Sequence, residues 1–235
     1  MRSLSLRLFA GVLLMSVLPL AANAGTTTFG PTPYLQFGDT PADFFCTACA
    51  SHIEDFEDGM LDGFLSINNG MIFPPNGTTG TSNPSTDSVD GDDGAVDGIG
   101  LEGYSWFSGN GATSIEVSFA NDVKAAGLVF TDGDSDSSNV LLEALDMSGN
   151  VLALINAGDL ADDSFFGETE EDRFLGFTDM DAAISSIRIS IDAGSGIEID
   201  HIHWQEACAV PEPSTSFLAL FGVLGFWGYR RRSGR

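Results

Sequence analysis

Short apolar stretches that alternate with polar residues run through the middle of the chain and predict β-strands. Apolar and polar side chains alternate over 114–119 and 187–192, and 126–130 is a short apolar run suited to a buried strand. Two further apolar stretches, 140–145 and 151–155, flank a glycine-bearing loop and predict a hairpin. No stretch between the ends of the chain keeps a helical period. We therefore predict an all-β fold, a single jelly-roll-like β-sandwich ectodomain.

The last predicted strand, 197–204, carries two of the three histidines of the chain. Simple alternation places one set of side chains on one face and the other set on the opposite face. The first set is Ile197, Ile199, His201 and His203, and the second is Glu198, Asp200, Ile202 and Trp204. Two histidines on one face are able to hold a metal, although such pairs more often belong to a half-buried core or an edge.

The first 24 residues have the pattern of a secretory signal peptide. Two arginines precede the apolar stretch 8–20, and Ala22-Asn23-Ala24 is a small-x-small cleavage site. Signal peptidase is therefore expected to cut between Ala24 and Gly25. A retained N-terminal anchor is the alternative, and the apolar stretch is short for a membrane span.

The C-terminal end combines three features in a fixed order. Val210, Pro211, Glu212 and Pro213 come first, then an apolar stretch over 216–229, then Arg230, Arg231 and Arg232. The prolines stop both helix and strand, so this motif should stand as a short extended segment. A helix over 214–229 would be about 24 Å long at ~1.5 Å per residue, close to the ~30 Å of a bilayer core. The arginines are expected to stay in the cytoplasm.

This arrangement resembles the PEP-CTERM sorting signal of Gram-negative bacteria, over residues 210–232. The resemblance implies an inner-membrane-anchored precursor that is processed near the Pro-Glu-Pro motif by an exosortase, a membrane-embedded cysteine transpeptidase-like enzyme. It also implies delivery to the cell surface or an exopolysaccharide matrix. An ordinary membrane anchor is the alternative.

Four segments follow from these patterns. Residues 1–24 form the signal peptide, 25–50 a lead-in segment, 51–209 the β-sandwich domain, and 210–235 the sorting signal with its transmembrane helix. The formal net charge is −25, and the bases between the two end segments are only Lys124, Arg173 and Arg188. Such an acidic surface repels nucleic acid, so no nucleic-acid partner is expected.

The three cysteines, Cys46, Cys49 and Cys208, lie before the first and after the last strand of the predicted sandwich. An exported chain meets an oxidising compartment, so a disulfide is expected. Cys208 is expected to bridge one cysteine of the pair, with a local Cys46–Cys49 bridge as the alternative. A redox motif would need a βαβ context that is missing, and zinc would need a fourth ligand besides nearby His52.

Two acidic, glycine-bearing loops are candidates for Ca²⁺, which prefers hard oxygen ligands on a tightly turning backbone. Glu57 and Asp200 would add ligands from the first and last strands. The candidate ligands are therefore Glu57, Asp90, Asp92, Asp93, Asp97, Asp132, Asp134, Asp136 and Asp200. Neither loop completes an EF-hand, and the alternative is solvated loops that keep the protein soluble.

The stretches Phe56-Glu57-Asp58-Gly59 and 197–202 resemble β-sandwich ectodomains often attached to this sorting signal, some of them similar to carbohydrate-binding modules. We expect a non-catalytic surface or biofilm-matrix protein. The first alternative is a carbohydrate-binding module acting on the cell's own polysaccharide. A glycan hydrolase or lyase is less favoured, because a Gly-x-Ser-x-Gly elbow is missing and acids are too abundant to single out a pair.

Overall fold

The structure, a computed structural model, describes residues 25–75, 86–133, 139–160, 167–179, 183–194 and 196–207. These residues form strands joined by loops and two short 3-10 helices. The elements in order are β1 (Thr27–Pro33), η1 (Phe37–Asp39), β2 (Ser51–Glu54), β3 (Leu65–Ile67), β4 (Met71–Phe73), η2 (Asp90–Asp93), β5 (Ser105–Phe107), β6 (Ser114–Asp132), β7 (Asn139–Leu145), β8 (Val151–Asp159), β9 (Arg173–Thr178), β10 (Ile184–Ser190) and β11 (Glu198–Glu206).

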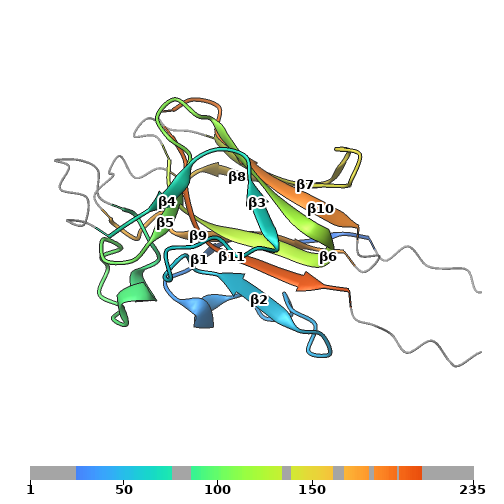
Figure 1. The fold of residues 1–235 in the computed structure, drawn as a ribbon, viewed down its shortest axis with the longest axis horizontal. Helices are drawn as coiled ribbons and strands as arrows, with labels where there is room; N and C mark the ends of the chain where they lie inside the picture. Colours follow the sequence, from blue (N-terminus) through green and yellow to red (C-terminus); the bar gives the residue numbers. More distant parts are fainter. Residues whose placement is uncertain are drawn as a thin grey trace, which may run out of the picture.

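The long strand β6 connects the two layers of the fold. Its first part pairs with β3 and β10, and its second part pairs with β9 and β11. The hairpin β7–β8 extends the first layer from β10, while β1 lies on β9 and β2 and β5 lie on β11 (Figure 1). The expected strands at 114–119 and 126–130 are thus two parts of one strand. The predicted all-β sandwich is confirmed, and each of these strand pairs is antiparallel.

The main hydrophobic core lies between the two layers. It includes Ile115 and Leu128 from β6, Leu142 from β7, Ile187 from β10 and Trp204 from β11, all at most 2% exposed. Burial of such side chains stabilises a fold by roughly 25 cal/mol per Å² of apolar surface removed from water. Alternating apolar positions on these strands supply the core, as the sequence pattern predicts.

A second, smaller cluster covers the other face of β6 and β9. Tyr34, Phe44 and Val89 pack there against Val129 and Phe174. Tyr34 and Phe44 come from residues 25–50, which therefore contribute the strand β1 and the cover of this face, beyond the lead-in expected from the sequence. The second parts of β6 and β9 are consequently buried on both faces.

Strand β11 contains a β-bulge at Asp200 and His201. The pairing register with β6 shifts between Asp200 and His203, and His201 has a φ of +39°. A bulge adds one residue to a strand and so reverses the alternation beyond it. Ile199 and Ile202 therefore both face the main core, whereas Asp200 and His201 both face the second cluster.

Simple alternation along 197–204 therefore holds through Asp200 and is wrong from His201 onward. The main core receives Ile197, Ile199, Ile202 and Trp204. No glycine or proline within 197–204 marks the bulge. Its trace in the sequence is the switch of the apolar residues from odd positions, Ile197 and Ile199, to even positions, Ile202 and Trp204.

The two expected end segments, 1–24 and 210–235, lie outside the described residues. Among the residues that are described, no helix is long and apolar enough to cross a bilayer.

Gln205 holds the cysteine-bearing turn against the end of β11. Its side-chain amide accepts a hydrogen bond from the Cys46 N–H at 2.9 Å and donates to the carbonyls of Cys46 and Cys49 at 2.8 and 3.2 Å. Cys46 is exposed and its thiol is free, so the local Cys46–Cys49 alternative is not formed. Cys208 lies outside the described residues, three positions after Gln205. Gln205 thus places Cys49 beside the strand that leads to Cys208.

We predict that Cys49 bridges Cys208 in the exported protein, while Cys46 stays free. The bridge would close a loop of about 160 residues and contribute a few kcal/mol in the chain-entropy model. Peptide mapping after alkylation should find Cys46 labelled and Cys49 linked to Cys208. Cys49→Ser should lower the melting temperature, whereas the matched Cys46→Ser should leave it nearly unchanged. A Cys208 thiol that alkylates without reduction would refute the pairing.

Candidate metal centre

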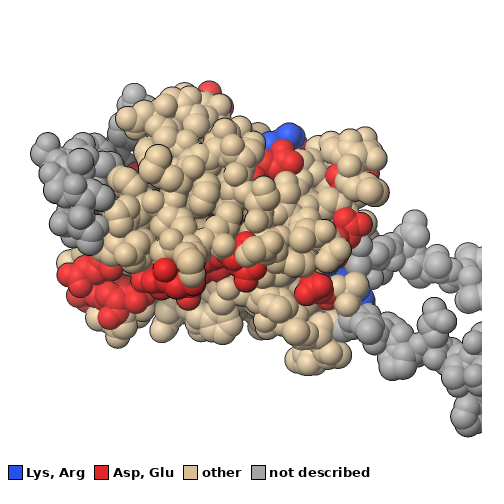
Figure 2. All heavy atoms as spheres, in the orientation of Figure 1, with Lys and Arg blue, Asp and Glu red and all other residues tan. Residues whose placement is uncertain are grey.

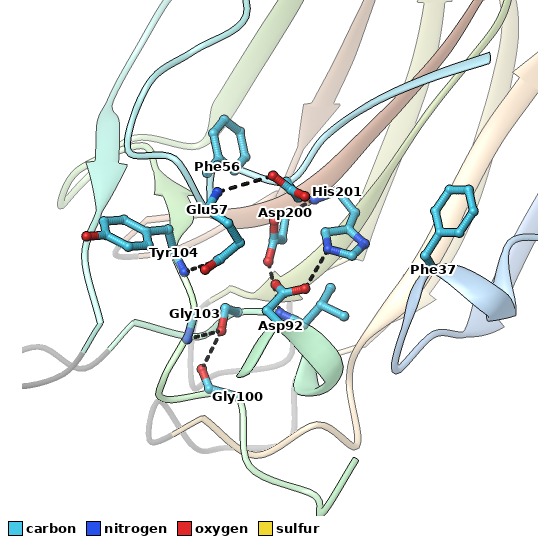
Figure 3. A network of polar contacts seen from close by, with 12 residues as sticks. Phe37, Phe56, Glu57, Asp92, Gly100, Gly103, Tyr104, Asp200 and His201 are labelled. Atoms are coloured by element: carbon cyan, nitrogen blue, oxygen red, sulfur yellow. Dashed lines mark hydrogen bonds and ion pairs between the residues drawn. The ribbon is translucent and has the colours of Figure 1, made fainter. Parts of the chain in front are cut away.

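Asp92, Asp200 and His201 converge where η2 meets the bulge of β11. Each offers one ligand atom, and these atoms lie within 4.8 Å of one another. His201 Nε2 is 2.8 Å from Asp92 Oδ1, and the Asp92 and Asp200 carboxyl groups share a hydrogen bond (Figure 3). Three groups able to bind a cation thus surround one point at this end of the sandwich.

Backbone contacts fix both sides of this centre. The N–H of Val89 donates to Asp200 Oδ2 at 2.9 Å, and the N–H of Gly91 donates to the Leu35 carbonyl at 2.8 Å. A Cβ on Gly91 would lie 2.9 Å from the Gln36 Cβ, so this close approach favours glycine. The η2 loop is therefore held against both β11 and the 34–36 segment, and Asp92 is positioned by its backbone.

Tyr34 lies between the two histidines. Its hydroxyl is 2.9 Å from His201 Nδ1 and 3.1 Å from His203 Nε2. Burial lowers the pKa of His203, and the neighbouring His201 lowers it further, so His203 is neutral. Burial also raises the pKa of Tyr34, which keeps its proton. When Tyr34 donates that proton to His203 Nε2, its oxygen can accept a hydrogen bond from His201 Nδ1–H.

Glu57 borders the centre from the turn after β2. Its Oε1 accepts a hydrogen bond from the Tyr104 N–H at 2.5 Å. Burial raises the pKa of Glu57 to about 7, and the charges of Asp92 and Asp55 act in the same direction. The preceding residue, Phe56, has a φ of +57°, an unusual conformation for a bulky side chain. Strained backbone therefore lies on both sides of the centre, at Phe56 and at His201.

A cleft of about 390 Å³ opens from the centre to solvent, lined in part by Phe37, Asp55, Glu57, Asp92 and His201. The Phe37 ring is 55% exposed and stacks on the His203 ring at 5.9 Å. Acidic side chains form a band across this face of the molecule (Figure 2). The cleft thus combines an apolar ring, a histidine and several carboxylates.

The donor set is two carboxylates and one imidazole. Imidazole nitrogen suits Zn²⁺ and carboxylate oxygens suit Mn²⁺, whereas Ca²⁺ prefers oxygen ligands alone. Burial and the Asp92 charge raise the pKa of Asp200 well above its usual value. A bound cation would offset the repulsion between the two carboxylates.

The structure brings three of the sequence-predicted ligands together: Glu57, Asp92 and Asp200 border one centre. Asp90 is turned away, since its carboxylate accepts the N–H groups of residues 97–99 and closes the loop.

The remaining predicted ligands lie elsewhere. Asp93 and Asp97 are exposed, and Asp132 lies near Asp87. Asp134 and Asp136 are outside the described residues. Sequence reasoning did not single out Tyr34, because no local motif marks it.

Comparison with known proteins shows what class of chain carries this ectodomain. The PEP-CTERM protein-sorting motif matches residues 209–233. The chain is a PEP-CTERM protein: it carries the sorting signal of an exosortase substrate behind an all-β ectodomain. It is thus an exported, exosortase-processed surface protein, made as a membrane-anchored precursor. No curated protein sequence matches the chain.

The ectodomain has distant likeness to parts of larger solved proteins. The catalytic domain of a GH87 alpha-1,3-glucanase in complex with tetrasaccharides is 15% identical over 70% of this chain and 30% of that one, with a TM-score of 0.35. A family 89 glycoside hydrolase from Clostridium perfringens is 15% identical over 63% and 15% of the two chains, with a TM-score of 0.32. For the tailspike protein 4 of bacteriophage CBA120 the identity is 11%, the coverage 68% and 19%, and the TM-score 0.29. The chain spans less than a third of each.

The buried acids predict that the stability of the fold decreases as pH rises. Burial raises the pKa of Glu57 and of Glu198 to about 7 and that of Asp200 well above its usual value. The folded protein therefore binds more protons than the unfolded chain, and stability is lost as pH rises through about 7. In a chelator, we expect the melting temperature to fall by several degrees between pH 5 and pH 8. A melting temperature that rises over this interval would contradict the assignment.

Proposed function

We propose that this PEP-CTERM protein is a non-catalytic surface or matrix protein whose β-sandwich is a cation-dependent binding module. The observation that carries the proposal is the convergence of Asp92, Asp200 and His201 at the base of an open cleft. Asp92 and Asp200 would supply negative charge and His201 a nitrogen ligand. The bound ion would act as a Lewis acid toward oxygen atoms of a ligand in the cleft.

The contacts of the neighbouring acids favour a binding role over catalysis. Both oxygens of Glu54 accept backbone N–H groups, from Phe56 and Asp62, and Glu57 accepts the N–H of Tyr104. These carboxylates close loops around the cleft, so they are less available for proton transfer to a substrate. The raised pKa of Glu57 alone is a weak argument for a general acid, since burial explains it.

A carbohydrate ligand is favoured by the exposed ring of Phe37 beside the centre. An aromatic face stacks on a sugar ring, while neighbouring sugar hydroxyls are oxygen ligands for a cation. A neutral polysaccharide avoids the repulsion that this acidic face exerts on anions. The cell's own exopolysaccharide, which an exported protein meets first, is the ligand we propose.

The two parts of this proposal share one experiment. Full-length protein freed of metal should bind Zn²⁺ or Mn²⁺ in calorimetry, and it should retain cell-derived polysaccharide in a pull-down only with that ion present. Asp92→Asn should weaken ion binding at least tenfold, because it removes one charged ligand. The matched control Asp93→Asn removes an exposed neighbouring charge and should behave as the unaltered protein.

Other outcomes of the same experiment separate the alternatives. Ion binding without retention of the polysaccharide would support the metal centre and contradict the proposed glycan ligand. Shortening of the polysaccharide on incubation would mean an enzyme. Equal effects of the two Asn variants would contradict the centre itself.

Sorting generates a separate prediction. The signal combines a Pro-Glu-Pro motif, an apolar stretch and an arginine cluster. We expect each of them to be needed for processing by the exosortase. Pro211→Ala with Pro213→Ala, or deletion of 230–232, should leave uncleaved precursor in the inner membrane. Cell fractionation and blotting would show this, and normal surface release of either variant would contradict it.

A further inference from the structure

A second group of polar side chains is buried without hydrogen-bond partners near the metal centre. Asp87 is 1% exposed, and Asp172 and Thr131 are 0% exposed. None of the four carboxylate oxygens, nor the Thr131 hydroxyl, has a hydrogen-bond partner within the described part of the chain. Buried polar atoms of native proteins are nearly always paired, so these oxygens indicate a place for a bound ion or water.

Strand register places two of these groups side by side. Phe130 of β6 pairs with Arg173 of β9, and Val129 pairs with Phe174. Continuing this antiparallel register sets Thr131 opposite Asp172. Both positions share the face of Val129 and Phe174, which belongs to the second cluster. The hydroxyl and the carboxylate therefore project from adjacent strands to the same side.

Asp87 approaches this face from the segment that precedes η2. Its N–H donates to Glu198 Oε1 at 2.7 Å, and the next N–H, of Ser88, donates to the Gly100 carbonyl at 2.8 Å. A Cβ on Gly100 would lie 2.1 Å from the Ser88 carbonyl oxygen and 3.3 Å from Asp87 Oδ1, so only glycine allows this approach. Burial raises the pKa of Asp87 well above its usual value, and the charges of Glu198, Asp172 and Glu171 add to it.

Protonation alone does not satisfy these groups. A neutral carboxylic acid has an O–H donor and acceptor oxygens, and burying them unpaired is costly as well. Ionised, the two acids would repel each other and buried Glu171. Burial raises the pKa of Asp172 well above its usual value, and Arg173 opposes this only in part. Arg173 Nη1 donates to the Asp172 backbone carbonyl rather than to the carboxylate. A bound cation would satisfy the oxygens and the charge together.

We propose that Asp87, Thr131 and Asp172 form a Ca²⁺ site that is distinct from the Asp92–Asp200–His201 centre. The donors are oxygens only, which is the set that Ca²⁺ prefers and that disfavours Zn²⁺. The ion would join the segment before η2 to the start of β9 and the end of β6. It would thereby fix the loop from which Asp92 reaches the first centre.

Thermal unfolding of the full chain, freed of metal with a chelator, tests the site. Millimolar Ca²⁺ should raise the melting temperature by several degrees, and Mg²⁺ at equal ionic strength should raise it much less. Asp87→Asn with Asp172→Asn should remove the Ca²⁺ effect and raise the melting temperature in chelator, because the buried repulsion is gone. The control pair Asp93→Asn with Asp97→Asn makes the same change of charge on exposed residues and should keep the Ca²⁺ effect.

Further variants keep the result interpretable. Thr131→Val keeps the side-chain shape, and it should weaken Ca²⁺ binding severalfold in calorimetry even if the double variant does not fold. Asp92→Asn should keep the Ca²⁺ effect, which separates this site from the first centre. Failure of the unaltered protein to bind Ca²⁺ would overturn the proposal and would mean that buried water satisfies these oxygens. An unchanged Ca²⁺ effect in the Asp87 and Asp172 double variant would also overturn it.

Discussion

The bulge in β11 is the constraint on which both the core and the metal centre depend. Without it, alternation would send either Asp200 or His201 into the main core. With it, Ile199 and Ile202 stay in the core while Asp200 and His201 both reach Asp92. The unusual backbone at His201, with its φ of +39°, is stabilised by the strands paired on both sides of β11. Two of the three groups of the candidate centre thus come from a paired strand, and the third, Asp92, comes from η2.

Buried acids gather at the end of the sandwich where we propose the two cation sites. Asp87, Asp90, Asp172, Glu198 and Asp200 are each at most 4% exposed. Asp90 and Glu198 accept hydrogen bonds from backbone or hydroxyl groups. Asp87 and Asp172 have no such partners within the described part of the chain. Buried acids of the first kind hold loops, whereas those of the second kind raise the free energy of the ion-free fold.

The sequence predicts the sandwich and part of the site, for identifiable reasons. Alternation over 114–119 and 187–192 reports the core faces directly, and the C-terminal motif is contiguous, so it can be read without a fold. The sequence identifies Glu57, Asp92 and Asp200 as candidate ligands, because they are acids in loops or in a terminal strand. It does not identify Tyr34, Asp87 or Asp172, because each looks like an ordinary loop residue until strand pairing brings it into place. Simple alternation also missed the bulge, although the apolar residues switch from odd positions 197 and 199 to even positions 202 and 204 across it.

Export and cation dependence fit together physically. A chain that must cross a membrane before it folds gains from a fold that is weak without an ion and strong with one. The buried repulsion opposes compaction where free divalent cations are scarce. Outside the cell, where Ca²⁺ is more abundant, an ion that binds the folded state alone stabilises it by about 2.7 kcal/mol at a hundredfold excess over Kd. The buried acids would then keep the ion-free sandwich weak until it meets Ca²⁺. The sandwich would become stable on the side of the membrane to which the sorting signal delivers it.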